Sequence, residues 1–231
     1  MSLESVLIVS EKTWNKKLLC CLQSTMPQYS FYLISKKEDF TIERIDSISP
    51  VKIFIPHWSY IIPPSIFKQY ECILFHMTDL PYGRGESPLQ NLIVRGLTAT
   101  KLSALRVEAG LDTGPVYLKM DLSLLGTAEE IFIRANDQIE KMIFDILQND
   151  LQPMPQVGEP VIFKRRKPEQ SDMNELEKIE DVLIISVCWM RKDTPHAYIE
   201  KGAFKYEFTC ASIKADGSII ADVKITKNNY G

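Results

Sequence analysis

The stretch ECILFHMTDLPYGRGESPLQN, residues 71–91, decides how the rest of the chain is interpreted. Its apolar start, Cys72 to Phe75, predicts a buried strand that ends at His76, and a loop rich in proline and glycine follows. In an open parallel sheet, ligands bind beyond the carboxyl ends of the strands. His76 is therefore placed where a site is expected, although a single histidine is more often structural.

Similar apolar runs elsewhere in the first half predict the other strands of a sheet. They are Val6 to Val9, Phe31 to Ile34 and Val51 to Ile55. Helical patterns separate them, and the first such helix is expected after Thr13, with Trp14, Leu18, Leu19 and Leu22 on one face. Continuous apolar strands in a β-α-β order predict an α/β fold with a mostly parallel sheet covered on both faces.

The second half predicts a long helix, a linker and a small β-rich module. A helix is expected from Glu129 to about Gln148, and Thr127 with Glu130 forms a capping-box pattern at its start. The segment QPMPQVG, residues 152–158, is predicted to be a linker because prolines and glycine break a helix. Alternating residues from Phe204 to Cys210 and the turn signal at 216–217 predict strands. We expect a catalytic domain at 1–150, a linker at 151–160 and a module at 161–231.

Composition excludes several classes of partner. The chain has 231 residues, a formal net charge of -3 and a pI of about 5.7, so no nucleic-acid partner is expected. Its five cysteines contain no CxxC pair, so neither a disulfide framework nor a metal site is predicted. We find no leader segment and no apolar run long enough to span a membrane, and therefore expect a cytoplasmic protein without a membrane partner.

A second motif supports a role for the histidine. Residues 110–114 read GLDTG, a glycine-flanked loop with a single acid, Asp112, which follows His76 by 36 positions. An aspartate between glycines is usually a turn residue. A buried aspartate beside a histidine, however, orients the imidazole and raises its basicity.

Three motifs in order carry a family resemblance. Residues 76–88 resemble the pattern H-x-S/T-x-L-P-x-x-R-G-x-x-P of folate-dependent formyltransferases, and residues 110–114 resemble the G-L-D-T-G element that follows it. Upstream, PHWSYIIP at 56–63 is similar to the A-Y-G-x-I-L-P folate-side loop. The resemblance covers about residues 1–170 and is to the methionyl-tRNA formyltransferase-like family. It implies a Rossmann-like formyltransferase fold followed by a small C-terminal β-rich module.

The resemblance also implies a donor and a set of site residues. The donor is N10-formyltetrahydrofolate, without a metal, and an amine of the acceptor attacks its formyl carbon. His76 is the implied acid/base group and Asp112 its partner. The implied folate-binding residues are Trp58, Ser59, Tyr60, Ile61, Val107, Glu108, Ala109, Gly110, Leu111 and Asp112.

One position departs from the family pattern. Relatives carry an asparagine two residues before the histidine that helps to hold the oxyanion, and here that residue is Leu74. A leucine side chain has no hydrogen-bond donor, and loss of one such donor typically costs about 10²–10³ in rate. Either a substitute donor, such as Asn91 or a backbone N–H, fills the role, or the enzyme is weakened or inactive.

Further similarities concern the acceptor. Residues 163–171, FKRRKPEQS, and 195–199, PHAYI, resemble stretches of sugar N-formyltransferases, and residues 76–91 look closest to members of nonulosonic (pseudaminic acid) pathways. The implied acceptor is a nucleotide-linked, UDP-bound 4-amino-4,6-dideoxy sugar. Its contacts are expected at Thr78, Arg84 and Lys164. Arg84 and Lys164 are the expected phosphate partners, because cationic side chains bind phosphate oxygens.

Other functions stay open at this point. The same fold would serve a non-catalytic folate or sugar-nucleotide binding protein, a hydrolase that releases formate, or an enzyme that formylates a carrier-bound amino acid. Phe204, Tyr206 and Phe208 of the C-terminal module could bury against a second copy of the chain, which makes a homodimer a candidate assembly.

Overall fold

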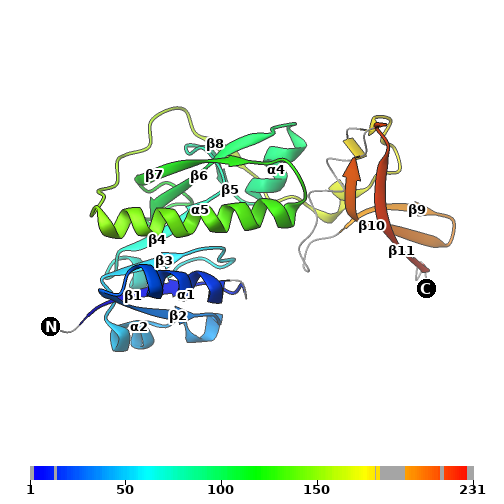
Figure 1. Cartoon of the computed structure of the whole chain (residues 1–231). Coiled ribbons are helices and arrows are strands. Elements are labelled where there is room, and N and C mark those ends of the chain that lie inside the picture. Colours follow the sequence, from blue (N-terminus) through cyan, green and yellow to red (C-terminus); the bar gives the residue numbers. More distant parts are fainter. Residues whose placement is uncertain (1–2, 13–14, 180, 183–195, 214–215, 228–231) are drawn as a thin grey trace. The chain divides into compact units, whose positions relative to one another are not determined.

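The computed structural model describes residues 3–12, 15–179, 181–182, 196–213 and 216–227 (Figure 1). Contacts divide the chain into two compact units, which are described separately. The first comprises residues 1–84, 101–121 and 135–161, and the second comprises 85–100, 122–134 and 162–231. The predicted division into 1–150, 151–160 and 161–231 stays a prediction. Residues 85–100 and 122–134, which it assigns to the catalytic domain, are grouped by contacts with residues 162–231.

The first unit is built on a mixed sheet with the strand order β2-β1-β3-β4-β6-β7. The four predicted strands are confirmed as β1 (Glu4–Val9), β2 (Tyr29–Ile34), β3 (Lys52–Ile55) and β4 (Cys72–His76), and neighbours among them pair in parallel. Their continuous apolar runs follow from burial on both faces. Residues 6–9 of β1, for example, are fully buried.

Two further strands complete this sheet, β6 (Ala99–Arg106) and β7 (Val116–Ser123). β6 is antiparallel to β4, so that Ser103 lies opposite His76 and Arg106 lies opposite Ile73. The end of β6 therefore lies beside the start of β4, and the backbone N–H of Val107 donates to the carbonyl oxygen of Cys72 over 2.8 Å. The sheet remains mostly parallel, as predicted.

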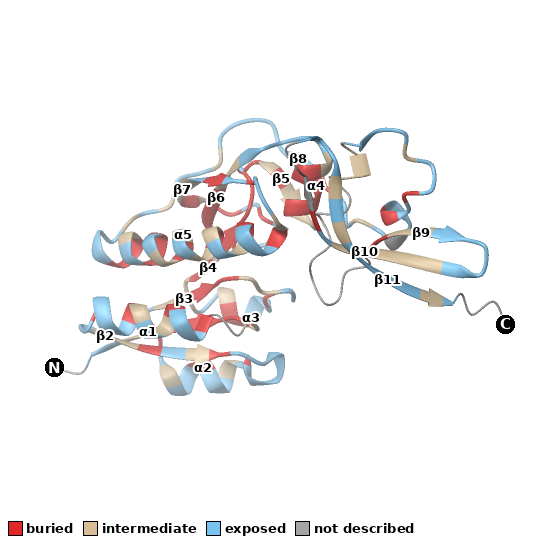
Figure 2. Cartoon of the chain, turned by 45° about the vertical axis from the view of Figure 1, so that its right-hand side comes forward, coloured by how far each residue is buried: buried red, intermediate tan, exposed pale blue. Residues whose placement is uncertain are grey.

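Helices connect and cover the strands. The bounds are α1 (Asn15–Thr25), η1 (Lys37–Asp39), α2 (Ile42–Ile48), α3 (Pro64–Phe67) and α5 (Ala128–Gln148). The helix predicted after β1 is confirmed and buries Leu18 and Leu22, whereas Thr13 and Trp14 lie outside the described residues. Figure 2 shows the buried residues gathered on the strands and on the inner faces of the helices.

The predicted capping box starts α5 as expected. The N–H of Thr127 donates to Glu130 Oε2 over 2.7 Å, and the N–H of Glu130 donates to Thr127 Oγ1 over 3.3 Å. Hydrogen bonds from Thr127 hold the pKa of the Glu130 carboxyl below its usual value. This reciprocal bonding fixes where the helix begins, and its apolar stripe is buried at 131, 135, 139, 142, 143 and 146.

The second unit contains helix α4 (Pro88–Val94), all but the first residue of the short β8 (Val161–Phe163), and η2 (Pro168–Ser171). Its C-terminal part is an antiparallel sheet in the order β11-β10-β9, formed by β9 (Ala197–Lys201), β10 (Phe204–Ile213) and β11 (Ile219–Lys227). The β-rich module is thus confirmed. The apolar run Val182 to Met190 fits either a helix or a strand by its sequence, and its residues 183–190 lie outside the described residues. Within the part of the chain that is described, no helix is long and apolar enough to cross a membrane.

Candidate active site

His76 is the last residue of β4 and is buried, with 6% of its surface exposed. Its Nε2 lies 2.8 Å from the carbonyl oxygen of Gly83, in the loop that follows. Since a carbonyl oxygen only accepts, Nε2 carries a proton in this contact. Nδ1 then faces the other way and lies 3.6 Å from Oδ2 of Asp112. The structure therefore brings together the two residues expected to act as a pair.

Asp112 lies in the loop between β6 and β7 and is 7% exposed. This loop starts beside the first residue of β4, because β6 runs antiparallel, so it must fold back along the sheet for Asp112 to meet His76. Asp112 has a φ of 53°, in the left-handed region that aspartate tolerates better than most residues. Gly114 has no room for a side chain, since a Cβ there would lie 1.8 Å from the carbonyl oxygen of Arg106.

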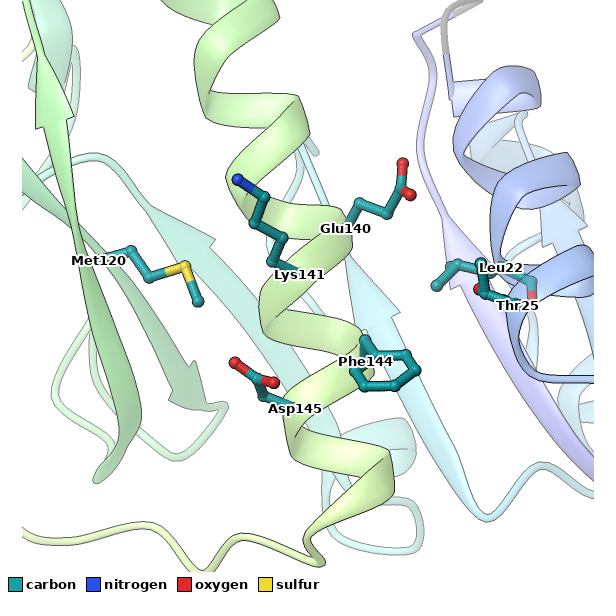
Figure 3. Close-up of a pocket in the computed structure, with 7 residues that line it drawn as sticks. All are labelled: Leu22, Thr25, Met120, Glu140, Lys141, Phe144 and Asp145. Atoms are coloured by element: carbon teal, nitrogen blue, oxygen red, sulfur yellow. Dashed lines mark hydrogen bonds between the residues drawn. The ribbon is translucent and has the colours of Figure 1, made fainter.

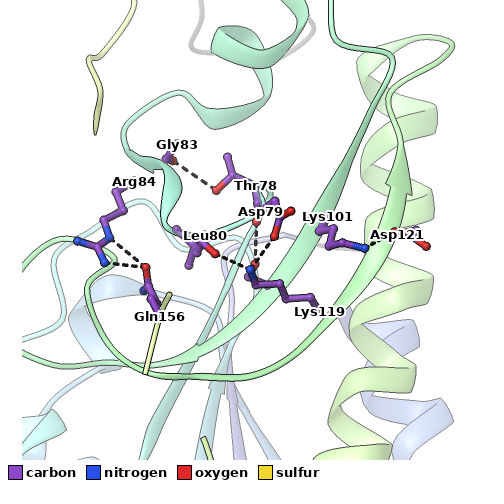
Figure 4. A network of polar contacts seen from close by, with 10 residues as sticks. Thr78, Asp79, Leu80, Gly83, Arg84, Lys101, Lys119, Asp121 and Gln156 are labelled. Atoms are coloured by element: carbon purple, nitrogen blue, oxygen red, sulfur yellow. Dashed lines mark hydrogen bonds and ion pairs between the residues drawn. The ribbon is translucent and has the colours of Figure 1, made fainter. Parts of the chain in front are cut away.

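Gln156, from the predicted linker, joins the Asp112 loop to Arg84 of the first motif. Gln156 Oε1 accepts from Nε and Nη2 of Arg84, over 3.0 and 2.8 Å (Figure 4). Its Nε2 donates to the carbonyl oxygens of Asp112 and Gly114, over 2.8 and 2.7 Å. Arg84 was predicted to contact substrate, and two of its N–H groups are engaged with Gln156.

Residue 74 is an apolar neighbour of the histidine. Because side chains alternate along a strand, Leu74 and His76 point to the same face of β4. Leu74 is partly buried and packs against Leu80, Leu105 and Val116. The side chain of residue 74 therefore cannot donate a hydrogen bond to an oxyanion, as the sequence indicated.

Asn91, the predicted substitute donor, belongs to α4 in the second unit and is 6% exposed. Its Nδ2 donates to the carbonyl oxygens of Glu86, Ser87 and Lys164, over 3.1, 3.0 and 3.0 Å. Its two N–H groups are therefore already engaged within that unit, which favours the alternative of a backbone N–H as the donor. Lys164, predicted to contact the substrate, is exposed in the same unit.

The predicted folate-side loop follows β3 and exposes apolar groups. Trp58 is half-buried and makes edge-to-face contacts with Phe40 and Tyr60, at ring separations of 5.5 and 5.3 Å. Tyr60 is 40% exposed and Ile61 is 89% exposed, while Ser59 is also exposed. The loop follows β3, which is the neighbour of β4 in the sheet. Because β3 and β4 are parallel, both strands end at the same edge.

The other predicted folate contacts lie in the loop at 107–112. Leu111 is 59% exposed, and Ala109 and Gly110 are exposed beside it. Glu108 differs in that its carboxylate accepts from Nε and Nη2 of Arg106, over 3.1 and 2.7 Å. Val107 is half-buried and bonds to β4 through its backbone. Apolar groups and backbone are thus accessible on this loop, which is what a flat heterocycle would need.

The loop between His76 and Arg84 is held by polar contacts that sequence inspection missed. Lys119 on β7 pairs with Asp79 over 2.6 Å and also donates to the carbonyl oxygen of Leu80 (Figure 4). Thr78, predicted to bind substrate, is fully buried; its hydroxyl donates to the carbonyl oxygen of Gly83 over 3.4 Å. Ser103 donates to the carbonyl oxygen of Thr78 over 2.7 Å.

A separate pocket of about 310 Å³ lies between α1, β7 and α5 (Figure 3). Its lining residues are Leu22, Thr25, Met120, Glu140, Lys141, Phe144 and Asp145. None of them is a predicted site residue, so we place no part of the candidate site there. Among the described residues, no cluster of histidine, cysteine or carboxylate side chains could hold a metal ion.

Comparison with known proteins decides the family. A solved structure of methionyl-tRNA formyltransferase from Clostridium thermocellum is 43% identical, with a TM-score of 0.93, and the match covers 98% of this chain and all of that one. The chain belongs to the methionyl-tRNA formyltransferase-like family of formyltransferases. The family described as methionyl-tRNA formyltransferase, C-terminal domain, also matches residues 192–226 of this formyltransferase-family chain.

Other similar proteins are longer than this chain or have a lower sequence identity to it. Methionyl-tRNA formyltransferase from Rickettsia felis is 30% identical over 136 residues, which are 56% of this chain and 45% of that protein, so the chain matches about half the length of this relative. HypX from Aquifex aeolicus, solved in complex with tetrahydrofolic acid, shares the fold with a TM-score of 0.80 and 19% identity, over 92% of this chain and 38% of HypX. A sugar N-formyltransferase from Shewanella shares the fold with a TM-score of 0.65 and 14% identity, over 95% and 96% of the two chains.

Proposed function

We propose that this chain transfers a formyl group from N10-formyltetrahydrofolate to a primary amine. The observation that carries the proposal is the buried pair of His76 and Asp112, which join the two loops that match the formyltransferase motifs. Membership of the formyltransferase family supports the reaction class. The tetrahydrofolate held by HypX supports a folate co-substrate, and the accessible loops at 58–61 and 107–111 offer apolar and backbone surface for it.

The contacts of His76 support a specific path for the transferred proton. The attacking amine forms a C–N bond to the formyl carbon and must lose a proton, while N10 of the folate gains one as its bond to that carbon breaks. Nε2 of His76 is committed to Gly83, so the nitrogen that exchanges this proton is Nδ1. The carboxylate of Asp112 beside Nδ1 stabilises the imidazolium formed during transfer. With leucine at position 74, a backbone N–H supplies the oxyanion contact.

Two acceptor classes are favoured by different observations. The name of the similar Clostridium protein favours methionyl-tRNA. Charge favours a small acceptor, the nucleotide-linked 4-amino-4,6-dideoxy sugar, because residues 162–231 contain 12 lysines and arginines against 11 aspartates and glutamates. A tRNA-binding module normally carries a clear basic excess. The pseudaminic acid type of sugar is the specific form of this second proposal.

Mass spectrometry can test both acceptors in one experiment. The purified chain is incubated with N10-formyltetrahydrofolate and either a UDP-linked 4-amino sugar, its dTDP-linked counterpart or charged initiator methionyl-tRNA. We expect a gain of one formyl group on one acceptor, and its loss in the His76→Ala variant. Formate release without an acceptor would instead identify a hydrolase. Tight folate binding without any product would identify a binding protein and overturn the proposal.

We also propose that β11 forms the interface of a homodimer. It is the outer strand of its sheet, and no described strand pairs with its free edge. Val223 and Ile225 are 47% and 59% exposed there. Antiparallel pairing of two copies centred on Val223 places Asp222 of each copy opposite Lys224 of the other, which gives two ion pairs and joins the apolar faces. Such a twofold, self-complementary contact is typical of homodimers.

A further inference from the structure

Gln156 is the residue that links the two motif loops of the candidate site. Along the sequence it lies 72 positions from Arg84 and 44 positions from Asp112. Its side chain nevertheless contacts both, together with Gly114 (Figure 4 shows the contact with Arg84). All four residues belong to the first unit.

The hydrogen bonds of this amide are complete. A primary amide has two N–H donors and a carbonyl oxygen with two lone pairs. Gln156 uses both donors on the carbonyl oxygens of Asp112 and Gly114, and its oxygen accepts twice from the Arg84 guanidinium. A flipped amide would place N–H groups against a cation and oxygen against two carbonyls. The surroundings therefore fix a single orientation of the side chain.

The loop that Gln156 holds is costly to form. Asp112 adopts a left-handed backbone with a φ of 53°, a conformation that residues other than glycine adopt only uncommonly. Two positions later, Gly114 packs directly against the backbone of Arg106. Gln156 binds the backbone of this strained turn, while the Asp112 carboxylate points to His76 Nδ1 at 3.6 Å. Gln156 thus bonds the backbone of Asp112, while the side chain of Asp112 faces the imidazole.

We propose that Gln156 is a positioning residue that sets the orientation of Asp112 toward His76 and couples it to Arg84. The inference rests on the proposed function, because the pair is assigned there to proton transfer. Gln156 has no direct role in bond making. Its effect passes through the backbone of the Asp112 loop on one side and through the guanidinium of Arg84 on the other.

The Gln156→Glu variant separates these two connections. A carboxylate still accepts from Arg84, but it cannot donate to the carbonyl oxygens of Asp112 and Gly114. We expect kcat to fall by about 10² because a shift of roughly 1 Å at a reacting group can cost that much. KM for the folate should change less than kcat. Lowering the pH protonates the introduced carboxyl and restores one donor, so the ratio of variant to parent kcat should rise toward acidic pH.

The matched control is Gln152→Glu, at an exposed residue of the same segment whose amide donates to the carbonyl oxygen of Asp150 over 3.1 Å. It should keep the parent kcat and pH profile. A Gln156→Glu enzyme with the parent kcat at every pH would overturn the inference. Gln156→Met, which removes both connections without a charge, should lose activity without the acid recovery.

A second readout separates this inference from the proposed function. Hydrogen exchange of the peptide covering 107–115 reports on the loop without any substrate. We expect faster exchange in Gln156→Met and Gln156→Glu than in the parent and in Gln152→Glu. If the parent transfers no formyl group but the exchange difference is present, the proposed function fails and the role of Gln156 in positioning the loop stands. Equal exchange in all four proteins would disprove that role.

Discussion

The Nε2 atom of His76 and the carbonyl oxygen of Gly83 lie 2.8 Å apart, and this contact decides which ring nitrogen is available for chemistry. It leaves Nδ1 on the side of Asp112, 3.6 Å from the carboxylate. The tautomer is thus set by the backbone of the loop that carries the first motif. In the proposed mechanism, substitutions at the pair should therefore lower turnover more than stability.

Asp112→Asn tests the charge of the pair while preserving its backbone, since asparagine also tolerates a left-handed φ. We expect kcat for formyl transfer to fall by about 10²–10⁴, the range of a lost acid–base contribution, with little change in melting temperature. His76→Ala should give a comparable loss. His196→Ala, in the C-terminal part, serves as the control and should retain activity. Full turnover by Asp112→Asn would show that the carboxylate has no part in the reaction.

Leu74→Asn tests the departure from the family pattern. The new amide would lie among Leu80, Leu105 and Val116, where a buried polar group without a partner costs about 2 kcal/mol. We expect lower stability in chemical denaturation and no gain in kcat. Leu74→Met, which keeps the site apolar, should lose less than about 1.5 kcal/mol. A faster Leu74→Asn enzyme would mean that the oxyanion contact is incomplete in the parent.

Gly114→Ala tests the close approach of the Asp112 loop to Arg106. The added Cβ would meet the carbonyl oxygen of Arg106 at 1.8 Å, so the loop must move. We expect a loss of about 3 kcal/mol in unfolding free energy, together with loss of activity. Gly217→Ala is the comparison, because Gly217 has a φ of 81° and no atom within 4 Å of its Cβ position. That variant should lose only about 1–2 kcal/mol and keep its turnover.

Alkaline pH should destabilise the protein through two buried groups. Burial raises the pKa of the Cys72 thiol from 9.0 to about 12, and burial with the Glu71 hydrogen bond raises the pKa of Tyr117 above its usual value. The unfolded thiol loses its proton from about pH 9, whereas the folded thiol keeps it until about pH 12, so the unfolding free energy falls across this window. Between pH 7 and 10.5, Cys72 alone contributes a loss of about 2 kcal/mol.

Urea unfolding at several pH values measures this slope. Cys72→Ala should show a shallower decline than the parent above pH 9, whatever its stability at neutral pH. Cys20→Ala, at an exposed cysteine, should follow the parent. Parallel declines for Cys72→Ala and the parent would contradict the assignment.

The proposed dimer makes a charge-swap prediction. In the pairing centred on Val223, the lysine introduced by Asp222→Lys faces Lys224 of the other copy, and this repulsion occurs twice. Light scattering should then report a monomer. Lys224→Asp should do the same, although this residue also lies 4.0 Å from Glu207 within its own chain. The double variant Asp222→Lys, Lys224→Asp restores opposite charges and should dimerise again. A monomeric parent would exclude the interface.

Sequence alone predicted the features that depend on local pattern. The four parallel strands were predictable because burial on both faces demands continuous apolar runs, and the start of α5 because Thr127 and Glu130 bond reciprocally. The pairing of His76 with Asp112 followed from the motifs of the family. The strands and the helix start need no knowledge of how distant segments meet, whereas the pairing of His76 with Asp112 came from the family resemblance.

The contacts that support the site could not be predicted in this way. Gln156 lies in a segment rich in proline and glycine, and nothing near it in the sequence points to Arg84, 72 residues earlier. Lys119 and Ser103 likewise act on the loop after β4 from strands that sequence patterns did not define. The antiparallel direction of β6, which makes the Asp112 loop fold back, is also a property of the tertiary arrangement.

The left-handed backbone of Asp112 has a consequence for evolution at this position. Selection for folding alone would accept asparagine and glycine there, since both adopt this conformation at low cost. Under the proposed function, selection for turnover would accept only the carboxylate. A saturation library sorted first for soluble expression and then for formyl transfer should therefore lose its asparagine and glycine clones at the second step, and a lineage that gave up catalysis would drift at residue 112 toward those two amino acids.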